Sequence, residues 1–410
     1  MKILISHPTG NANVRAAAEA LAQNRLLCQF YTTIAVFQNT FLYKLGSLPL
    51  MGELHRRTYN SILKPYAKNS PLYEVGRVLS SRLGVKRFQK SEDSLFSVDS
   101  IYRHLDKTVA HELSRLQKIG LNAVYAYEDG ALETFKKAKE LELTCFYDLP
   151  IGYWRAAREM LTKESLVRPE WAETMTGLAD SEEKTDRKDM ELSLADQIFV
   201  ASSFTAKTLD LYPGKLNEVK VIPYGFPSAY EDRTYNSITN RKLKVLFVGG
   251  LSQRKGIANV FEAADRLKNH IELTVVGRAS VADCKVLNDN LSKHKWFPSL
   301  PHSQILELMR SQDVLVFPSL FEGFGLVITE AMSQGTPVIT TDRTVGPDII
   351  THNVDGWITE AGSTNSLLNQ LELILSRSKI LEEAGRLSVK KAKSRPWSVY
   401  QKEIIDAILE

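Results

Sequence analysis

Two glutamates frame a glycine-bearing loop in the C-terminal third of the chain. Glu322 directly precedes Gly323, Gly325 follows two residues later, and Glu330 comes eight residues after Glu322. A carboxylate accepts hydrogen bonds and donates none, so both glutamates suit the hydroxyl groups of a sugar. Two plainer interpretations stay open: Glu322 favours the positive end of a helix, and Glu330 is a solvated helix residue.

The elements around this loop would place it at a ligand-binding edge. The pattern predicts that a strand ends at Ser319 and that a helix begins near Gly325 or Leu326 and stops at Gly335. Such a helix points its N-terminus at the carboxyl edge of the sheet, where ligands bind in open α/β folds. Free backbone N–H groups at that end favour an anion such as a diphosphate.

A second stretch could stabilise negative charge. Arg254 and Lys255 follow the Gly249-Gly250 turn. Two cations after a glycine turn suit a leaving diphosphate, because negative charge builds on the bridging oxygen as a glycosidic bond breaks. The alternative is a solvated basic turn.

Strand, turn and helix alternate twice along the chain. The expected strands are apolar runs at 2–6, 121–127, 144–149, 197–201 and 219–223, and again at 244–248, 272–276, 314–317 and 337–340. Two such series predict an α/β fold with two doubly wound, Rossmann-like domains facing across a cleft. We expect an acceptor-binding domain at 1–225, completed by a final helix at 395–410, and a donor-binding domain at 226–394.

Composition limits the function. The chain has 410 residues with a net charge of +4, which is far from the charge density of a nucleic-acid-binding protein. Three unpaired cysteines fit a reducing compartment, the N-terminus does not resemble a signal peptide, and no apolar run is long enough to span a membrane. We therefore expect a cytoplasmic protein.

One segment breaks the alternating rhythm. Residues 40–99 lack buried-strand runs and are expected to form a helical insertion in the first domain. Residues 40–95 contain ten Lys or Arg and four Asp or Glu. Arg82, Lys86 and Lys90 are spaced to share one face of a helix. This face is either solvated or docks on anionic lipid, in which case the protein would lie peripherally at the inner face of the membrane.

The stretch from Pro318 to Val338, P-S-x-x-E-G-F-G-x-x-x-x-E-A-M-x-x-G-x-P-V, resembles the signature of retaining GT-B glycosyltransferases of the family 4 type, which are sucrose-synthase-like and phosphatidylinositol-mannosyltransferase-like enzymes. The resemblance extends over 195–400 and covers 1–150 only in outline. It implies transfer of a sugar, with retention of configuration, from a nucleotide-diphosphate sugar to a hydroxyl acceptor. The acceptor would belong to glycan, glycolipid or envelope polysaccharide synthesis.

The resemblance also implies residue roles. Glu322 would contact the donor sugar close to the reacting carbon, and Glu330 would bind the ribose hydroxyls. The remaining donor-binding set would be Gly250, Arg254, Lys255, Gly277, Gly323, Phe324, Gly325, Leu326 and Val327.

The first domain departs from the family pattern. Many members carry His-Asp where this chain has Tyr147-Asp148, so a role built on the histidine is lost while Asp148 keeps a place as a catalytic residue or as a turn cap before Pro150. The family's glycine-rich first loop is reduced to Gly10, which could still let the backbone approach the donor phosphate or the acceptor. Glu128 and Asp129 are alternative carboxylates for the cleft.

No zinc-type spacing and no D-x-D motif occurs, so we expect metal-independent chemistry without a cofactor. A NAD enzyme would need G-x-G-x-x-G after a strand, which neither domain opening has. A catalytically inactive scaffold that binds a sugar nucleotide, or a nucleotide-sugar epimerase of GT-B fold, stays open as an alternative.

Overall fold

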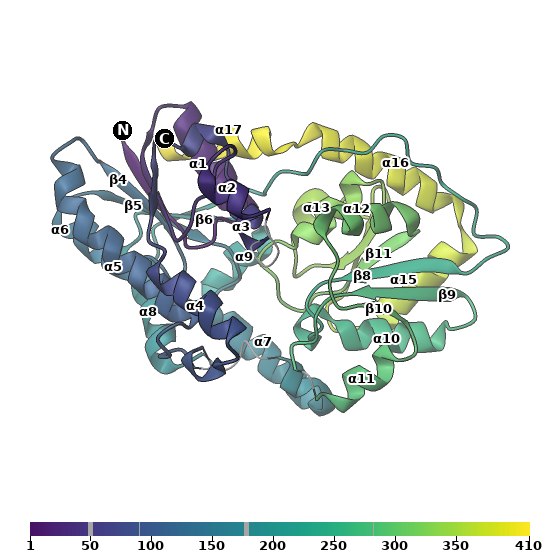
Figure 1. The fold of residues 1–410 in the computed structure, drawn as a ribbon. Coiled ribbons are helices and arrows are strands. Elements are labelled where there is room, and N and C mark those ends of the chain that lie inside the picture. The colour runs from purple at the N-terminus through teal and green to yellow at the C-terminus, as the bar shows by residue number, and fades with distance from the viewer. Residues whose placement is uncertain (48–51, 90, 176–179, 282) are drawn as a thin grey trace.

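The strands form two sheets in which all neighbouring strands are parallel. The structure is a computed structural model, and it describes residues 1–410 except 48–51, 90, 176–179 and 282. The two sheets lie in separate halves of the molecule, each covered by helices (Figure 1). The predicted α/β fold with two Rossmann-like domains is thereby confirmed.

The first sheet has the order β3-β2-β1-β4-β5-β6-β7. Its strands are β1 (Ile3–Ser6), β2 (Leu27–Thr32), β3 (Ala67–Asn69), β4 (Ala123–Tyr127), β5 (Thr144–Leu149), β6 (Gln197–Val200) and β7 (Glu218–Val221). Chain order reverses between β1 and β4, which pair from Ile3 with Ala123 to Ser6 with Ala126. All five residues of β4 are buried, as expected for a central strand that is covered on both faces.

The second sheet repeats this order as β10-β9-β8-β11-β12-β13. Its strands are β8 (Leu243–Val248), β9 (Ile271–Val276), β10 (Lys295–Phe297), β11 (Val314–Phe317), β12 (Val338–Thr341) and β13 (Trp357–Thr359). Its reversal lies between β8 and β11, which pair through Val245 with Val314 and Leu246 with Leu315.

Helices connect the strands in both domains. Those before β8 are α1 (Ala12–Gln23), α2 (Phe41–Leu45), α3 (Glu53–Arg56), η1 (Ser61–Leu63), α4 (Leu72–Arg82), η2 (Lys86–Phe88), α5 (Val98–Gln117), α6 (Leu132–Glu140), α7 (Trp154–Val167), η3 (Pro169–Thr174), α8 (Glu182–Leu194), α9 (Ser203–Thr208) and η5 (Leu209–Leu211). Those after β8 are η6 (Gln253–Lys255), α10 (Ile257–Arg266), α11 (Lys285–Leu291), α12 (His302–Ser311), α13 (Leu326–Ser333), α14 (Gly346–Ile349), α15 (Thr364–Ser376), α16 (Lys379–Ser394) and α17 (Trp397–Leu409).

The last helix returns to the first domain, as predicted. Helix α16 runs along the second domain and α17 lies beside α1, so both chain ends are in the same half of the molecule (Figure 1). The side-chain amide of Gln401 donates a hydrogen bond of 3.3 Å through Nε2 to the carbonyl of Ala16. The chain crosses between the domains near Phe226 and again near Arg395. These two crossings are in contact, because the Phe226 amide donates to the Arg395 carbonyl at 2.9 Å.

A second connection is formed by a segment that follows the first sheet and packs on the second domain. Helix α7 and η3 follow β5 of the first sheet, yet η3 packs against the second domain. Arg168 pairs with Glu262 of α10 at 2.8 Å, and the Trp171 ring stacks on Phe261 at 6.1 Å between centroids. The domains are therefore joined at both sides of the space between them.

The segment at 40–99 differs in part from the prediction. It contains short helices, but it also supplies β3, an edge strand that pairs with β2. The expectation of one helix carrying Arg82, Lys86 and Lys90 is wrong, because α4 ends at Arg82 and Gly84 has a left-handed φ of +71°. Lys86 falls in η2, and Lys90 lies outside the described residues.

Candidate active site

The two loops predicted to carry the chemistry meet at the reversal point of the second sheet. Strands β8 and β11 are neighbours, so the loop with Arg254 and Lys255 and the loop with Glu322 leave the same edge side by side. Ligands bind at such points in open α/β sheets because the two loops diverge there and leave a crevice.

Arg254, Lys255 and Glu322 form one charged cluster. The Lys255 ammonium contacts a carboxylate oxygen of Glu322, and the Arg254 guanidinium lies 3.9 Å from the same oxygen. Arg254 also donates to the Phe321 carbonyl at 2.8 Å. Burial and the neighbouring Arg254 lower the pKa of Lys255, whereas the contact with Glu322 favours the charged ammonium. With both cations charged, the cluster would hold one positive charge in excess.

The start of α13 faces the same place. Gly325 precedes the helix with a left-handed φ of +89°, a conformation that glycine adopts without strain. Within the described part of the chain, the amides of Leu326 and Val327 donate to no protein acceptor. The first amides of a helix have no partner inside the helix, so these two are available to a ligand. Two free amides and the dipole of the helix favour an anion here.

Glu330 has a partner that the sequence did not indicate. The His302 ring lies with Nε2 3.0 Å from a carboxylate oxygen of Glu330. His302 is the first residue of α12. The hydrogen bond to Glu330 raises the pKa of His302, although burial opposes it.

The loop between Glu322 and Gly325 also touches the first domain. A Cβ atom on Gly323 would lie 1.9 Å from the Pro150 carbonyl oxygen, so only glycine permits this approach. The Gly323 carbonyl accepts hydrogen bonds from the hydroxyls of Ser202 at 2.6 Å and Thr205 at 3.0 Å. The ring of Phe324 packs on Tyr224 at 4.7 Å, so its side chain forms part of the contact between the domains.

Gly250 and Gly277 lie on the other side of the cluster. Gly277 ends β9, and a Cβ atom there would lie 1.8 Å from the Gly249 carbonyl oxygen. The indole of Trp296 donates to the Gly277 carbonyl at 2.9 Å. Gly250 is exposed, with open space where a side chain would stand. Both glycines therefore sit at the edge that carries Arg254 and Glu322.

Gly10 lies in the corresponding loop of the first domain, where the Tyr59 side chain covers it. A Cβ atom on Gly10 would collide with the Tyr59 hydroxyl, which comes from the 40–99 segment. The Gly10 amide donates to Nδ1 of His7 at 3.0 Å, and the Thr9 amide donates to the same atom at 3.1 Å. Burial and Arg57 lower the pKa of His7 to about 3, so its ring is neutral and organises this turn.

Asp148 is enclosed in the first domain, apart from the charged cluster. Its carboxylate accepts a hydrogen bond of 2.8 Å from Tyr125, and burial raises its pKa to about 7. Burial raises the pKa of Tyr224, which packs on Phe324, and of Tyr400 of α17, and the nearby Asp148 charge raises both further. Asp148 therefore lies close to the aromatic side chains that join the two domains. Its catalytic role stays a prediction.

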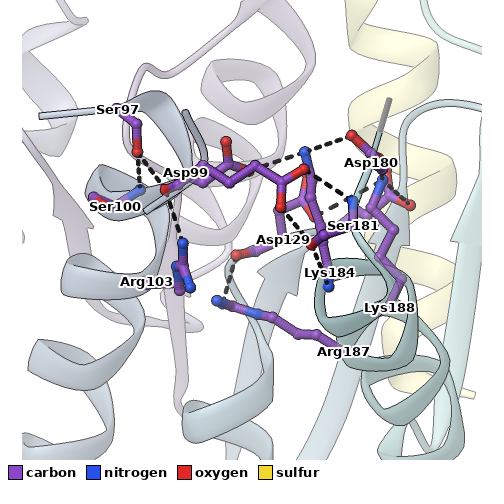
Figure 2. A network of polar contacts seen from close by, with 12 residues as sticks. Ser97, Asp99, Ser100, Arg103, Asp129, Asp180, Ser181, Lys184, Arg187 and Lys188 are labelled. Atoms are coloured by element: carbon purple, nitrogen blue, oxygen red, sulfur yellow. Dashed lines mark hydrogen bonds and ion pairs between the residues drawn. The ribbon is translucent and has the colours of Figure 1, made fainter. Parts of the chain in front are cut away.

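Glu128 and Asp129 belong to an ion-pair network. Lys188 lies 3.4 Å from Glu128, 3.8 Å from Asp129 and 3.3 Å from Asp180. Figure 2 shows that the network also contains Arg187, which donates to the Asp129 carbonyl, and Lys184, which lies 2.9 Å from Asp99. The network joins the β4–α6 turn to α5 and α8, so these carboxylates already have partners.

A cavity of about 270 Å³ lies between the two domains beside Arg254. Its lining includes Phe321 from the second domain, Trp154 and Arg158 of α7, and Asp180 and Lys188 from the ion-pair network. Its position next to the charged cluster makes it the space where a second substrate could meet a ligand held by Arg254 and α13.

Among the described residues, no group of three or more His, Cys, Asp or Glu could hold a metal ion. No helix in the described part of the chain is long and apolar enough to cross a membrane.

Residues 230–391 match the family described as glycosyl transferases group 1. A glycogen synthase of Mycobacterium tuberculosis is 29% identical over 154 residues, which are 35% of this chain and 37% of that protein, so the match spans little more than a third of that relative. Sucrose-phosphate synthase from Thermosynechococcus elongatus has a TM-score of 0.66 at 17% identity, over 100% of this chain and 98% of that one. Anabaena HepE in complex with UDP and glucose has a TM-score of 0.64 at 15% identity, over 100% and 99%. The second domain thus matches the family of glycosyl transferases group 1, and the whole chain shares the two-domain fold of these solved structures.

Proposed function

We propose that this protein transfers a sugar from a nucleotide-diphosphate sugar to a hydroxyl group of an acceptor. The observation that carries the proposal is the meeting of Arg254, Lys255 and the α13 N-terminus around Glu322. These groups offer two cations and two free amides to a diphosphate, and one carboxylate to a sugar hydroxyl. Glycogen synthase as a relative, and HepE solved with UDP and glucose, support a nucleotide-sugar donor.

The donor would lie across the edge of the second sheet. Its diphosphate would contact Arg254, Lys255 and the amides of Leu326 and Val327, and Glu330 would bind the ribose hydroxyls in place of His302. Glu322 would leave Lys255 and accept from a sugar hydroxyl near the reacting carbon. As the bond to the diphosphate breaks, the cations and amides stabilise the charge on the leaving oxygen.

The acceptor would enter from the first domain. The cavity beside Arg254 opens between α7, α8 and Phe321, so an acceptor hydroxyl placed there would approach the face from which the diphosphate departs. Attack on that face gives retention of configuration. The contact of Gly323 with Ser202 and Thr205 would close the domains over the reaction and exclude water.

We also propose that residues 40–95 contact an anionic surface, which would bring the enzyme to a lipid-linked or envelope-glycan acceptor. What supports this is charge: the exposed side chains of this segment include Lys44, Lys64, Lys68, Arg82 and Arg87, against Asp93 as an exposed acid.

The test is acceptor-dependent release of nucleoside diphosphate from UDP-, GDP- and ADP-sugars, followed by NMR of the anomeric centre of the product. A transferred sugar with its configuration retained supports the proposal. An inverted product would overturn the retaining mechanism. Donor binding without release would identify an inactive scaffold, and a changed sugar without acceptor would identify an epimerase.

A further inference from the structure

Helix α4 exposes a row of aliphatic side chains. Leu72, Val75, Leu79 and Leu83 are 71%, 43%, 53% and 75% exposed. They are spaced three or four residues apart, so Leu72, Val75 and Leu79 lie on one face of α4. Leu83, the residue directly after the helix, continues that face. We call these four residues the α4 stripe. A soluble surface rarely gathers four large aliphatic side chains in a row unless they meet a partner.

Neighbouring segments hold α4 both beside the stripe and on the opposite side of the helix. The ring of Phe96 packs so closely on Gly76 that a Cβ atom there would lie 2.3 Å from it. Glu74 is buried and pairs with Arg57 and Arg77. Burial raises the pKa of Glu74, but the hydrogen bond from Arg77 and the charge of Arg57 outweigh it and lower that pKa. Since α4 is anchored in this way, its exposed stripe is a fixed surface.

More apolar side chains are exposed nearby. Leu95 and Val98 flank Phe96, the residue that packs on α4, and they are 51% and 60% exposed. Figure 1 shows α4 on the outside of the first domain, in front of α5. The apolar surface is therefore larger than the helix alone.

The charges around the α4 stripe indicate what kind of partner it would bind. Lys68 precedes the stripe on β3, Arg82 lies next to it on α4 and Arg87 follows it, and all three are exposed. An apolar row with cations at both ends fits the boundary between anionic headgroups and acyl chains, where aliphatic side chains enter the bilayer and lysine or arginine stays at the phosphates. A protein partner or a second copy would not require cations at both ends.

We propose that the α4 stripe inserts into the surface of an anionic lipid bilayer and orients the cleft toward it. The orientation follows from the anchor, because Arg57, which pairs with Glu74 of α4, also donates to the Pro8 carbonyl at 3.1 Å. Pro8 lies in the loop after β1, at the ligand-binding edge of the first sheet. The inference rests on the proposed contact of residues 40–95 with an anionic surface and does not depend on sugar transfer.

The test is flotation of the full chain with vesicles of phosphatidylcholine, alone or mixed with phosphatidylglycerol. The wild-type protein should float with the mixed vesicles and much less with phosphatidylcholine alone. Leu72→Asn/Leu79→Asn/Leu83→Asn should weaken binding at least about tenfold, because three aliphatic side chains no longer enter the bilayer. Leu72→Met/Leu79→Met/Leu83→Met should bind as the wild type does.

A matched control uses three equally exposed apolar residues elsewhere. Ile119, Leu166 and Val167 are 66%, 78% and 73% exposed, so their replacement by Asn should leave binding unchanged. Undiminished binding of the Leu→Asn triple variant would show that the α4 stripe does not insert into the bilayer. The proposed electrostatic contact of residues 40–95 with the anionic surface would remain. No binding of the wild-type chain would overturn both. Self-association that the triple variant loses, without vesicle binding, would assign the stripe to a second copy.

Discussion

The Lys255 ammonium contacts the Glu322 carboxylate although the two residues are 67 positions apart in the sequence. Each follows a central strand of the second sheet, and the pair forms because those strands are neighbours. Without a ligand, each charge therefore neutralises the other. Donor binding would exchange this pair for a phosphate on Lys255 and a sugar hydroxyl on Glu322.

Glu322→Gln should separate binding from transfer. The variant keeps the shape of the side chain but leaves Arg254 and Lys255 without an anion, so nucleoside diphosphate should bind at least as tightly as in the wild type. Turnover should fall by about 100-fold, as expected when a charged contact to the reacting sugar is lost. Calorimetry with the diphosphate and a turnover assay measure the two effects. Weaker binding with unchanged turnover would contradict this assignment.

Arg254→Ala/Lys255→Ala should impair transfer. Each lost charged contact to the phosphates costs about 1.5–3 kcal/mol, or roughly 10- to 100-fold in turnover. Lys390→Ala/Lys402→Ala removes two exposed cations of α16 and α17 and should leave turnover as it is. If both double variants behave alike, the two cations near Glu322 do not stabilise the leaving group.

Gly323→Ala should keep the domains from closing fully. The added Cβ atom would lie 1.9 Å from the Pro150 carbonyl oxygen, and such overpacking costs about 1–3 kcal/mol. Turnover should fall, and small-angle scattering should show a larger radius of gyration in the presence of donor. Gly52→Ala is the control, because among the described residues no atom apart from those of its chain neighbours lies within 4 Å of its added Cβ. A Gly323→Ala enzyme with wild-type dimensions and turnover would show that this contact is dispensable.

Donor affinity should depend weakly on pH through His302. Below its raised pKa the protonated ring pairs with Glu330 and competes with the ribose hydroxyls. Affinity should therefore fall as the pH drops through that pKa, by less than about fivefold because the His302 side chain is exposed. Titrations of wild type and His302→Ala across neutral pH measure the effect. The variant should lose the dependence, and a dependence that persists in it would exclude His302 as the cause.

Asp148→Asn should stabilise the protein at neutral pH. Burial raises the pKa of Asp148 from 3.8 to about 7, so between these values the folded protein keeps a proton that the unfolded chain releases. The wild type should lose stability relative to the variant as the pH rises from 4 to 7, by up to about 1.4 kcal/mol per pH unit, and the difference should level off above pH 7. Denaturant unfolding at several pH values gives the difference. A constant difference would mean that Asp148 is ionised throughout.

The sequence predicted the strands that carry strong apolar runs but missed four others. β2 lies directly after α1, and the boundary is formed by Arg25 in a left-handed conformation, which composition does not signal. β3, β10 and β13 have three residues each, too few for a recognisable pattern. Short edge strands depend on their neighbours more than on their own residues.

The meeting of Arg254, Glu322 and α13 at one sheet edge was predictable because these residues lie within continuous motifs. The loops with Arg254 and Glu322 follow apolar strands, and α13 begins at a glycine, so local patterns place them. His302 beside Glu330 and Tyr59 over Gly10 were not predictable, because each contact joins separate segments through tertiary packing. The burial of Asp148 behind Tyr125 has the same origin.

A nucleotide-diphosphate sugar should bind at Glu330, Arg254 and the start of α13. The most direct test is thermal unfolding with UDP, GDP, ADP and their sugar conjugates, for the wild type, Glu330→Ala and Glu307→Ala, an exposed glutamate of α12. One nucleotide should raise the midpoint, by about 2.7 kcal/mol of stability at 100 times its dissociation constant. Glu330→Ala should lose the shift and Glu307→Ala should keep it. No shift with any nucleotide, or a full shift in Glu330→Ala, would contradict the placement of the donor site.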